Sequence, residues 1–142
     1  MKKNNRVPQC LASQSACACG GAQYAQCCGR LIDDGAIAAS AEQLMRSRYT
    51  AYTLGDQAYI ARTWAARTRM PVPDAGINDD ARWLGLEVRA ASTGGDTATV
   101  EFVARYKIGG RAQRLHEISR FVRENGQWFY LDGSFPESRT TP

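Results

Sequence analysis

The chain has 142 residues, of which 44% are hydrophobic, and a formal net charge of +4. This length and composition suit one globular domain with a small appendage, and they exclude a largely disordered chain. No apolar run approaches the roughly 20 residues needed to cross a bilayer, so an integral membrane protein is excluded. No apolar stretch follows the N-terminal lysines, and we therefore expect a cytoplasmic protein without a signal peptide.

Charge and cysteines divide the chain into two regions. Residues 1–32 carry four basic residues and no acidic one, whereas residues 33–142 carry 14 of each, so the whole net charge lies in the first region. All five cysteines lie in the first region as well. We therefore predict a flexible basic arm and a cysteine knuckle (residues 17–32) in the first region, and a single α+β domain in the second.

A helical pattern begins after Ser40. Ser40 and Gln43 have the spacing of a capping box, and apolar side chains then recur at helical spacing up to Gly55, a favourable helix end. Asp56 is placed to cap a second helix, whose apolar side chains extend to Trp64. Two helices are therefore expected in this part of the chain.

Prolines and a glycine in residues 67–80 predict a loop, with a turn of helix over residues 79–82. After Trp83 the apolar period changes from helical to two, which predicts a half-buried strand. Its apolar face is expected to carry Leu84, Leu86, Val88 and Ala90.

Three further strands are predicted, over residues 97–108, 111–124 and 127–135. They are separated by the hairpin signals Gly109-Gly110 and Asn125-Gly126, and a turn at residues 93–96 precedes them. Two helices followed by a four-stranded antiparallel meander is an α+β arrangement.

The sharpest chemical signal is the pattern C-x-C-x7-C-C formed by Cys17, Cys19, Cys27 and Cys28. Zinc prefers four tetrahedral thiolate or imidazole ligands, and two close pairs joined by a glycine-containing turn can surround one ion. Cys27 and Cys28 are adjacent, so both can bind one ion only at a bend or a helix start. The segment also has too little apolar mass to fold without a cross-link or a metal, and we predict a structural zinc site.

Other uses of these cysteines remain open. Disulfides are disfavoured in a reducing compartment, and C-x-C and C-C match poorly the C-x-x-C of redox enzymes. An iron–sulfur site is an alternative by ligand type. Cys10 is interpreted as a bystander that could replace one ligand.

The segment CACGGAQYAQCCG (residues 17–29) resembles the SEC-C motif, a small zinc knuckle first noted in the SecA translocation ATPase. Four further stretches resemble the uncharacterised bacterial YchJ-like family with a SEC-C motif. They are LMRSRYTAYTLGDQAYIARTW (residues 44–64), WLGLEV (83–88), VEFVARY (100–106) and SRFVRENGQWFYLDG (119–133).

The resemblance implies a SEC-C zinc knuckle joined to a domain like nuclear transport factor 2, a cone of curved sheet and helices. It implies zinc as cofactor and the four cysteines of the pattern as its ligands, and it supplies no established reaction. Two departures are visible. Seven residues separate Cys19 from Cys27, where the motif usually has eight, and Ala65-Ala66 replace a His-Pro pair that follows the helical tryptophan in many members.

A cone of this kind often encloses a pocket. The side chains predicted as candidates for lining it are Arg48, Tyr52, Trp64, Trp83, Glu101, His116, Arg120 and Trp128. The aromatic ones are explained more simply as core. Arg48 lies near the apolar stripe of its helix, where a buried arginine needs a carboxylate from Glu101, Glu117 or Asp132.

His116 is the only histidine, and it could act as a general base beside a carboxylate. An exposed or satisfied strand histidine is the simpler interpretation. No conventional catalytic triad can be assembled without it, and we assign no catalytic residue.

Two functions follow as hypotheses. In the first, the chain is a cytoplasmic zinc-binding protein whose knuckle docks another protein and whose cone is a scaffold or a ligand binder. This hypothesis favours a protein that is not an enzyme. The alternative is a small-molecule enzyme or binder that uses a pocket around His116. Nucleic acid is disfavoured because the basic arm carries few charges, and dimerisation through the open sheet face remains possible.

Overall fold

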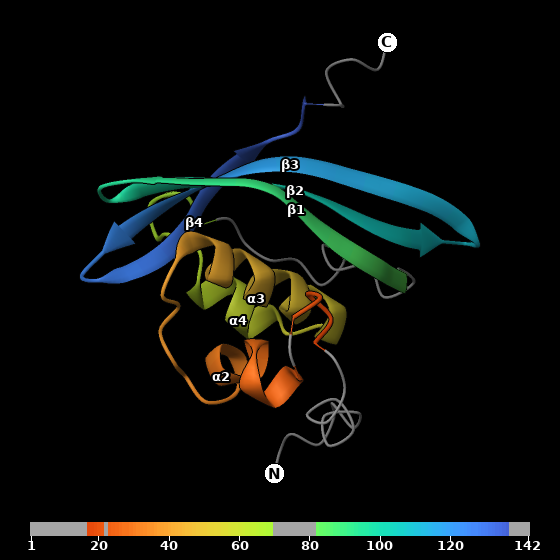
Figure 1. Ribbon diagram of the computed structural model, residues 1–142, viewed down its shortest axis with the longest axis horizontal. Helices are drawn as coiled ribbons and strands as arrows, with labels where there is room; N and C mark the ends of the chain where they lie inside the picture. The colour runs from red at the N-terminus through yellow and green to blue at the C-terminus, as the bar shows by residue number, and fades with distance from the viewer. Residues whose placement is uncertain (1–16, 22, 70–81, 137–142) are drawn as a thin grey trace.

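The computed structural model describes residues 17–21, 23–69 and 82–136 (Figure 1). The predicted arm, Cys10 and most of the predicted loop over residues 67–80 lie outside this part of the chain. The helical elements in chain order are the 3-10 helix η2 (Tyr24–Gln26), α2 (Cys28–Ile32), α3 (Ala41–Leu54) and α4 (Gln57–Arg62). The strands are β1 (Arg82–Gly94), β2 (Thr97–Ile108), β3 (Arg111–Glu124) and β4 (Gln127–Ser134).

The predicted caps of α3 are confirmed. The side-chain oxygen of Ser40 accepts a hydrogen bond from the backbone N–H of Gln43 at 3.1 Å. In return, the Gln43 side chain accepts one at 2.7 Å from the backbone N–H of Ala39, one residue earlier than an ideal capping box. The helix ends at Gly55, whose φ of 70° is left-handed and strained for other residues.

The second predicted helix also forms, and its end is fixed to the sheet. Asp56 Oδ1 accepts a hydrogen bond from the backbone N–H of Tyr59 at 3.0 Å, which starts α4. The helix stops at Arg62, before Trp64, because the chain there forms a bridge to Tyr130 of β4. The junction between helix and sheet is therefore held by backbone hydrogen bonds.

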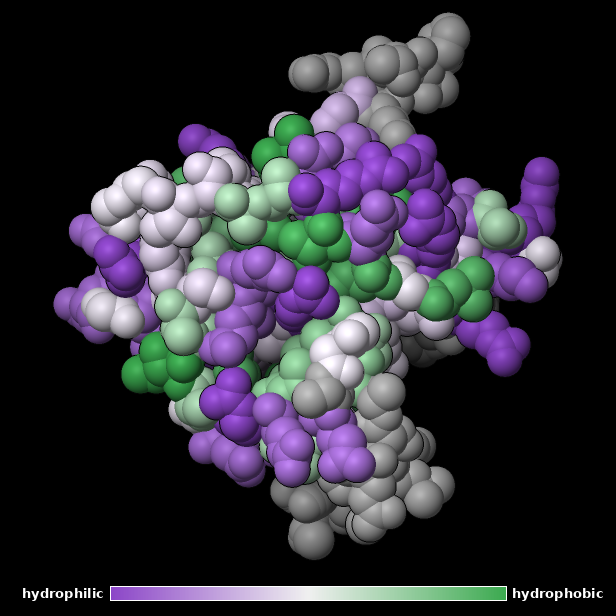
Figure 2. All heavy atoms as spheres, viewed as in Figure 1, coloured by the Kyte–Doolittle hydropathy of each residue, from purple (hydrophilic) through white to green (hydrophobic). Residues whose placement is uncertain are grey.

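The sheet is a four-stranded antiparallel meander in the order β1-β2-β3-β4, as predicted. Figure 1 shows α2, α3 and α4 on one side of it, with α3 nearest the strands. Figure 2 shows hydrophobic side chains reaching the surface between the sheet and the helices. None of the helices that the structure describes is long and apolar enough to cross a membrane.

β1 departs from the predicted alternation at two positions. Trp83 pairs with Tyr106, but the register shifts immediately afterwards, so Leu84 lies in a bulge with 53% of its surface exposed. A second shift after Val88 leaves Ala90 exposed. The prediction that Leu84 and Ala90 share the apolar face was wrong, because each bulge inserts a residue and reverses the direction of the following side chains. Trp83 packs against the core instead.

One buried cluster connects the knuckle, the helices and the sheet. It contains Cys17, Cys28 and Leu31 of the knuckle together with buried side chains of α3, α4 and the strands. The knuckle therefore packs against α3. The predicted boundary between the knuckle and the α+β domain at residue 32, the last residue of α2, stays a prediction.

Candidate functional site

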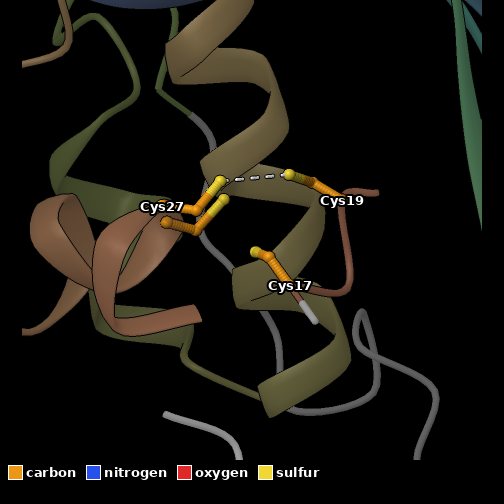
Figure 3. Close-up of side chains that lie close together, drawn as sticks. Cys17, Cys19 and Cys27 are labelled. Atoms are coloured by element: carbon orange, nitrogen blue, oxygen red, sulfur yellow. Dashed lines mark hydrogen bonds between the residues drawn. The ribbon is translucent and has the colours of Figure 1, made fainter. Parts of the chain in front are cut away.

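The four cysteines of the sequence pattern meet beside α3. Cys17 and Cys19 precede η2, Cys27 lies between η2 and α2, and Cys28 begins α2. Their sulfur atoms all lie within 4.8 Å of one another, and those of Cys19 and Cys27 are 3.6 Å apart. Figure 3 shows the labelled side chains of Cys17, Cys19 and Cys27 converging. The expected bend is present, because Cys27 has φ −123° and ψ −112°.

The donor set and spacing fit one tetrahedral metal ion. Sulfurs bound to zinc at roughly 2.3 Å lie roughly 3.8 Å apart. The observed separations, from 3.6 Å for Cys19 and Cys27 to at most 4.8 Å, need only a small adjustment to reach this value. Four cysteine ligands complete the coordination of zinc, as in structural sites, whereas catalytic sites leave one position open. The seven-residue spacer does not prevent convergence.

The thiols of this cluster shift one another's pKa. Hydrogen bonds from the thiols of Cys19 and Cys28 hold the pKa of Cys17 far below its usual range. The hydrogen bond with Cys17 raises the pKa of Cys19 to about 11, and the same partner raises the pKa of Cys28. One thiolate is thus stabilised by its neighbours, and a divalent cation would replace the remaining protons.

α3 supplies the surroundings of the sulfurs. The hydroxyl of Thr50 donates a hydrogen bond to Cys28 Sγ at 3.3 Å and lies 3.6 Å from Cys17 Sγ. Arg46 donates from Nη1 to the backbone oxygen of Cys19 at 2.8 Å. A hydroxyl and a guanidinium beside the sulfurs are the kind of outer-shell groups that orient ligands and offset a thiolate site's negative charge.

Two glycines allow the knuckle to close. A Cβ at Gly21 would lie 2.8 Å from Cys27 Sγ, and one at Gly29 would lie 2.7 Å from the backbone oxygen of Tyr24. Tyr24 is 3% exposed, and its ring supplies apolar cover for the knuckle. Its hydroxyl donates to Asp33 at 2.9 Å.

A second candidate site is a cavity of about 550 Å³ between α3 and the sheet. Most of its walls are aromatic or aliphatic. Lining side chains from the helical half are Met45, Arg48, Tyr49, Tyr52 and Trp64, and those from the sheet half include Trp83, Phe102, Tyr106, Leu115, Glu117, Ser119 and Tyr130.

Of the residues that the structure describes, Arg48 is the one basic side chain in this lining, and it is 6% exposed. Its Nη1 donates to the backbone oxygen of Ile60 at 2.9 Å and to Thr63 Oγ1 at 2.6 Å. Its guanidinium lies 4.5 Å from the centre of the Tyr130 ring and 5.5 Å from that of Trp64. Burial lowers the pKa of Arg48.

The expected carboxylate partner of Arg48 does not form an ion pair with it, although Glu117 attracts its guanidinium from a greater distance. Among the described residues no carboxylate lies within ion-pair distance of Arg48, because neutral acceptors and two aromatic faces surround its guanidinium instead. Two of the three predicted partners are engaged elsewhere. Glu101 contacts His116 at 2.7 Å, and Asp132 pairs with Arg120 at 2.6 Å.

Glu117 is a cavity residue that the list of predicted lining residues omitted. It is 8% exposed, and its Oε2 accepts hydrogen bonds from Ser119 at 2.9 Å and from the Tyr130 hydroxyl at 2.8 Å. Burial raises the pKa of Glu117. The signal was present in the sequence, since Glu117 alternates with Leu115 and Ser119 along one face of β3.

The structure brings together four of the eight predicted lining residues: Arg48, Tyr52, Trp64 and Trp83. It places His116 and Glu101 on the opposite face of the sheet, because His116 lies between the inward-facing Leu115 and Glu117. The prediction of a pocket around His116 was therefore wrong. The last two predicted lining residues also lie outside the cavity. Arg120 is on the surface, where it pairs with Asp132. Trp128 is buried elsewhere, with the guanidinium of Arg123 over its ring.

The sequence of residues 40–133 matches the family described as YchJ, middle NTF2-like domain. A UPF0225 protein of Methylibium petroleiphilum is 50% identical over 131 residues, covering 89% of this chain and 93% of that protein. The chain belongs to the UPF0225 family. Another UPF0225 protein, from Chromobacterium violaceum, is 46% identical over 129 residues, covering 85% and 93% of the two chains.

Two solved structures resemble this UPF0225 chain along most of its length. The solution structure of a SEC-C motif containing protein from Rhodopseudomonas palustris has a TM-score of 0.79 at 37% identity, covering 85% of this chain and 98% of that one. The crystal structure of a SEC-C motif containing protein from Psychrobacter arcticus has a TM-score of 0.75 at 29% identity, covering 86% and 83%. The predicted family and α+β fold are confirmed.

Proposed function

We propose that this protein binds a small molecule in the cavity between α3 and the sheet, and that zinc in the four-cysteine site holds the knuckle against α3. The cavity carries the proposal. Its volume of about 550 Å³ falls within the roughly 300–1,000 Å³ typical of ligand sites, and its apolar walls with a few polar groups are typical of them too.

The cavity is tested with a neutral apolar probe, N-phenyl-1-naphthylamine, whose fluorescence rises when it leaves water. We expect saturable fluorescence with the wild-type protein and its loss in Ala104→Leu, because Ala104 lines the cavity and a larger side chain would fill it. Arg105→Leu is the matched control, since Arg105 is the next residue of β2 and is exposed. Equal binding by all three proteins would contradict the proposal.

The zinc site is supported by four cysteine sulfurs within 4.8 Å and by the similarity to SEC-C motif proteins. Elemental analysis of protein purified without added zinc is expected to give about one zinc ion per chain, as for a closed four-thiolate site. Cys27→Ser should lose the metal, whereas Cys10→Ser should keep it. A wild-type protein with free thiols and no metal would overturn the assignment.

Docking of another protein on the knuckle is a second candidate function. It is supported by the outer surface of the knuckle, where Ala18, Gln23, Ala25, Gln26 and Arg30 are all exposed while the sulfurs face α3. A partner that binds this surface should tolerate Cys10→Ser and be lost with Gln26→Glu or Arg30→Glu. Once a partner is isolated, retention by both surface variants would contradict knuckle docking.

A further inference from the structure

The polar groups of the cavity are concentrated at one end, against β3 and β4. Arg48, Trp64, Glu117 and Tyr130 meet there, because the guanidinium of Arg48 lies over the ring of Tyr130 and the hydroxyl of Tyr130 donates to Glu117. Trp64 packs edge-on against Tyr130, with ring centres 5.2 Å apart. This end of the cavity thus combines charge with aromatic surface.

Hydrogen-bond donors remain unused at this end. The indole N–H of Trp64 is buried and has no hydrogen-bond partner among the residues that the structure describes. Arg48 donates hydrogen bonds through Nη1 alone, and its Nε and Nη2 make none within the same part of the chain. Buried donors without acceptors are costly, and buried charges are normally paired.

One oxygen of the acceptor at the same end is already satisfied. Glu117 Oε2 accepts two hydroxyl hydrogen bonds, from Ser119 and Tyr130. A cationic ligand would approach Glu117 beside the fixed positive charge of Arg48, which disfavours it. An anionic ligand would instead take up the unused donors of Arg48, whose planar fork matches a carboxylate. The Trp64 N–H is closed off from the cavity in this structure, and it would meet the same ligand after a small rotation of the ring.

The other end of the cavity, against β1 and β2, is aromatic. The ring centres of Trp83 and Tyr106 are 5.1 Å apart, and Tyr49 and Tyr52 lie at 5.6 and 6.4 Å from that of Trp83. Such a cluster offers ring faces and edges to a planar apolar group. The cavity is therefore polarised along its length.

We propose that the ligand is an aromatic carboxylate, with its carboxylate on Arg48 and the Trp64 indole N–H and its ring system against Trp83 and Tyr106. This inference rests on the proposed function of the cavity and specifies its ligand class. It assigns Arg48 and Trp64 as specificity-determining residues.

The test uses three probes of nearly equal shape: 2-naphthoate, neutral 2-naphthamide and protonated 2-naphthylmethylamine. Their affinities for the zinc-loaded full chain are measured by calorimetry and by displacement of N-phenyl-1-naphthylamine. We expect 2-naphthoate to bind about tenfold or more tightly than the amide, because a charged hydrogen-bonded pair is the strongest contact available. The amine should bind more weakly than the amide.

Two variants separate the contributions of the polar groups. Arg48→Gln should abolish the preference for 2-naphthoate over 2-naphthamide. Trp64→Phe keeps an aromatic ring but removes the N–H, and it should reduce the preference about threefold to tenfold. If Arg48→Gln fails to fold, the assignment is still tested by the preference of the wild-type protein for 2-naphthoate and by the reduced preference of Trp64→Phe.

The outcomes distinguish the two proposals. If the neutral probe does not bind in the cavity, the proposed function fails. If it binds and the amide or the amine equals or exceeds 2-naphthoate, the cavity stands and the carboxylate assignment is overturned. A preference for the carboxylate that survives unchanged in both variants would also overturn the assignment of Arg48 and Trp64.

Discussion

Thr50 and Cys28 are joined by a hydrogen bond of 3.3 Å from the threonine hydroxyl to the cysteine sulfur. Thr50 is 1% exposed in α3, and its neighbour Tyr49 lines the cavity. The same helix therefore forms one wall of the cavity and one side of the four-cysteine cluster. Changes at the metal site are expected to reach the cavity through α3.

Replacing Thr50 by valine should weaken metal binding without removing a ligand. Valine has nearly the shape of threonine but cannot donate to the sulfur, and loss of an outer-shell partner typically lowers metal affinity about tenfold to a hundredfold. Competition with a chromophoric chelator measures the change. Thr53→Val is the control, because the Thr53 hydroxyl donates to a backbone oxygen of α3 instead of a sulfur. Equal affinities in the two variants would contradict the role of Thr50.

Replacing Cys27 and Cys28 together by serine should lower the stability of the whole domain. Cys28 and Leu31 belong to the buried cluster that includes Leu44 and Tyr59 of the helices, so loosening the knuckle exposes part of the common core. We expect a loss of about 3 kcal/mol or more in the free energy of unfolding. Urea unfolding followed by far-UV circular dichroism measures it. An unchanged midpoint would show that residues 33–142 fold independently of the knuckle.

Gly133 of β4 should not tolerate a side chain. A Cβ built at Gly133 would collide with the carboxylate of Glu117, which is held in place by Ser119 and Tyr130. Gly133→Ala is therefore expected to destabilise the protein by about 1–3 kcal/mol. Gly85→Ala is the matched control, since a Cβ there would meet nothing within 4 Å. Thermal unfolding of the two variants compares them directly, and equal stabilities would contradict the tight packing of Glu117.

The order of the elements could be predicted from the sequence because each signal is local. The Ser40 cap and the Gly55 stop act within one helical turn, and the turn at Asn125-Gly126 has positive φ at both residues, 55° and 79°. The convergence of the cysteines was predictable for the same reason, since all four lie within twelve residues of one another in the sequence.

The lining of the cavity was harder to predict, because it depends on register. The bulge at Leu84 in β1 makes Trp83 face inward and Leu84 outward, and no residue type in that segment predicts it. His116 drew attention as the only histidine, although the alternation of β3 places Glu117 in the cavity. The alternation of side chains along the strand was thus a better guide to the cavity lining than the presence of a single histidine.

Glu117 should make stability depend on pH with a defined sign. Burial raises the pKa of Glu117 in the folded protein, so the folded state binds this proton more tightly than the unfolded state does. The contribution of Glu117 to stability is therefore greatest below about pH 4.3, the pKa of a glutamate in the unfolded chain. It is lost as the pH rises from there through the pKa of Glu117 in the folded protein. Glu117→Gln should remove this dependence, because the amide oxygen can still accept from Ser119 and Tyr130.

Urea unfolding of the wild type and of Glu117→Gln between about pH 4 and pH 8 tests this expectation on both sides of the ordinary glutamate pKa. The metal site responds to pH equally in both proteins, so the difference between their free energies of unfolding isolates Glu117. The variant should gain stability relative to the wild type as pH rises through this range. A difference that stays constant with pH, or that grows in favour of the wild type, would show that burial does not raise the pKa of Glu117.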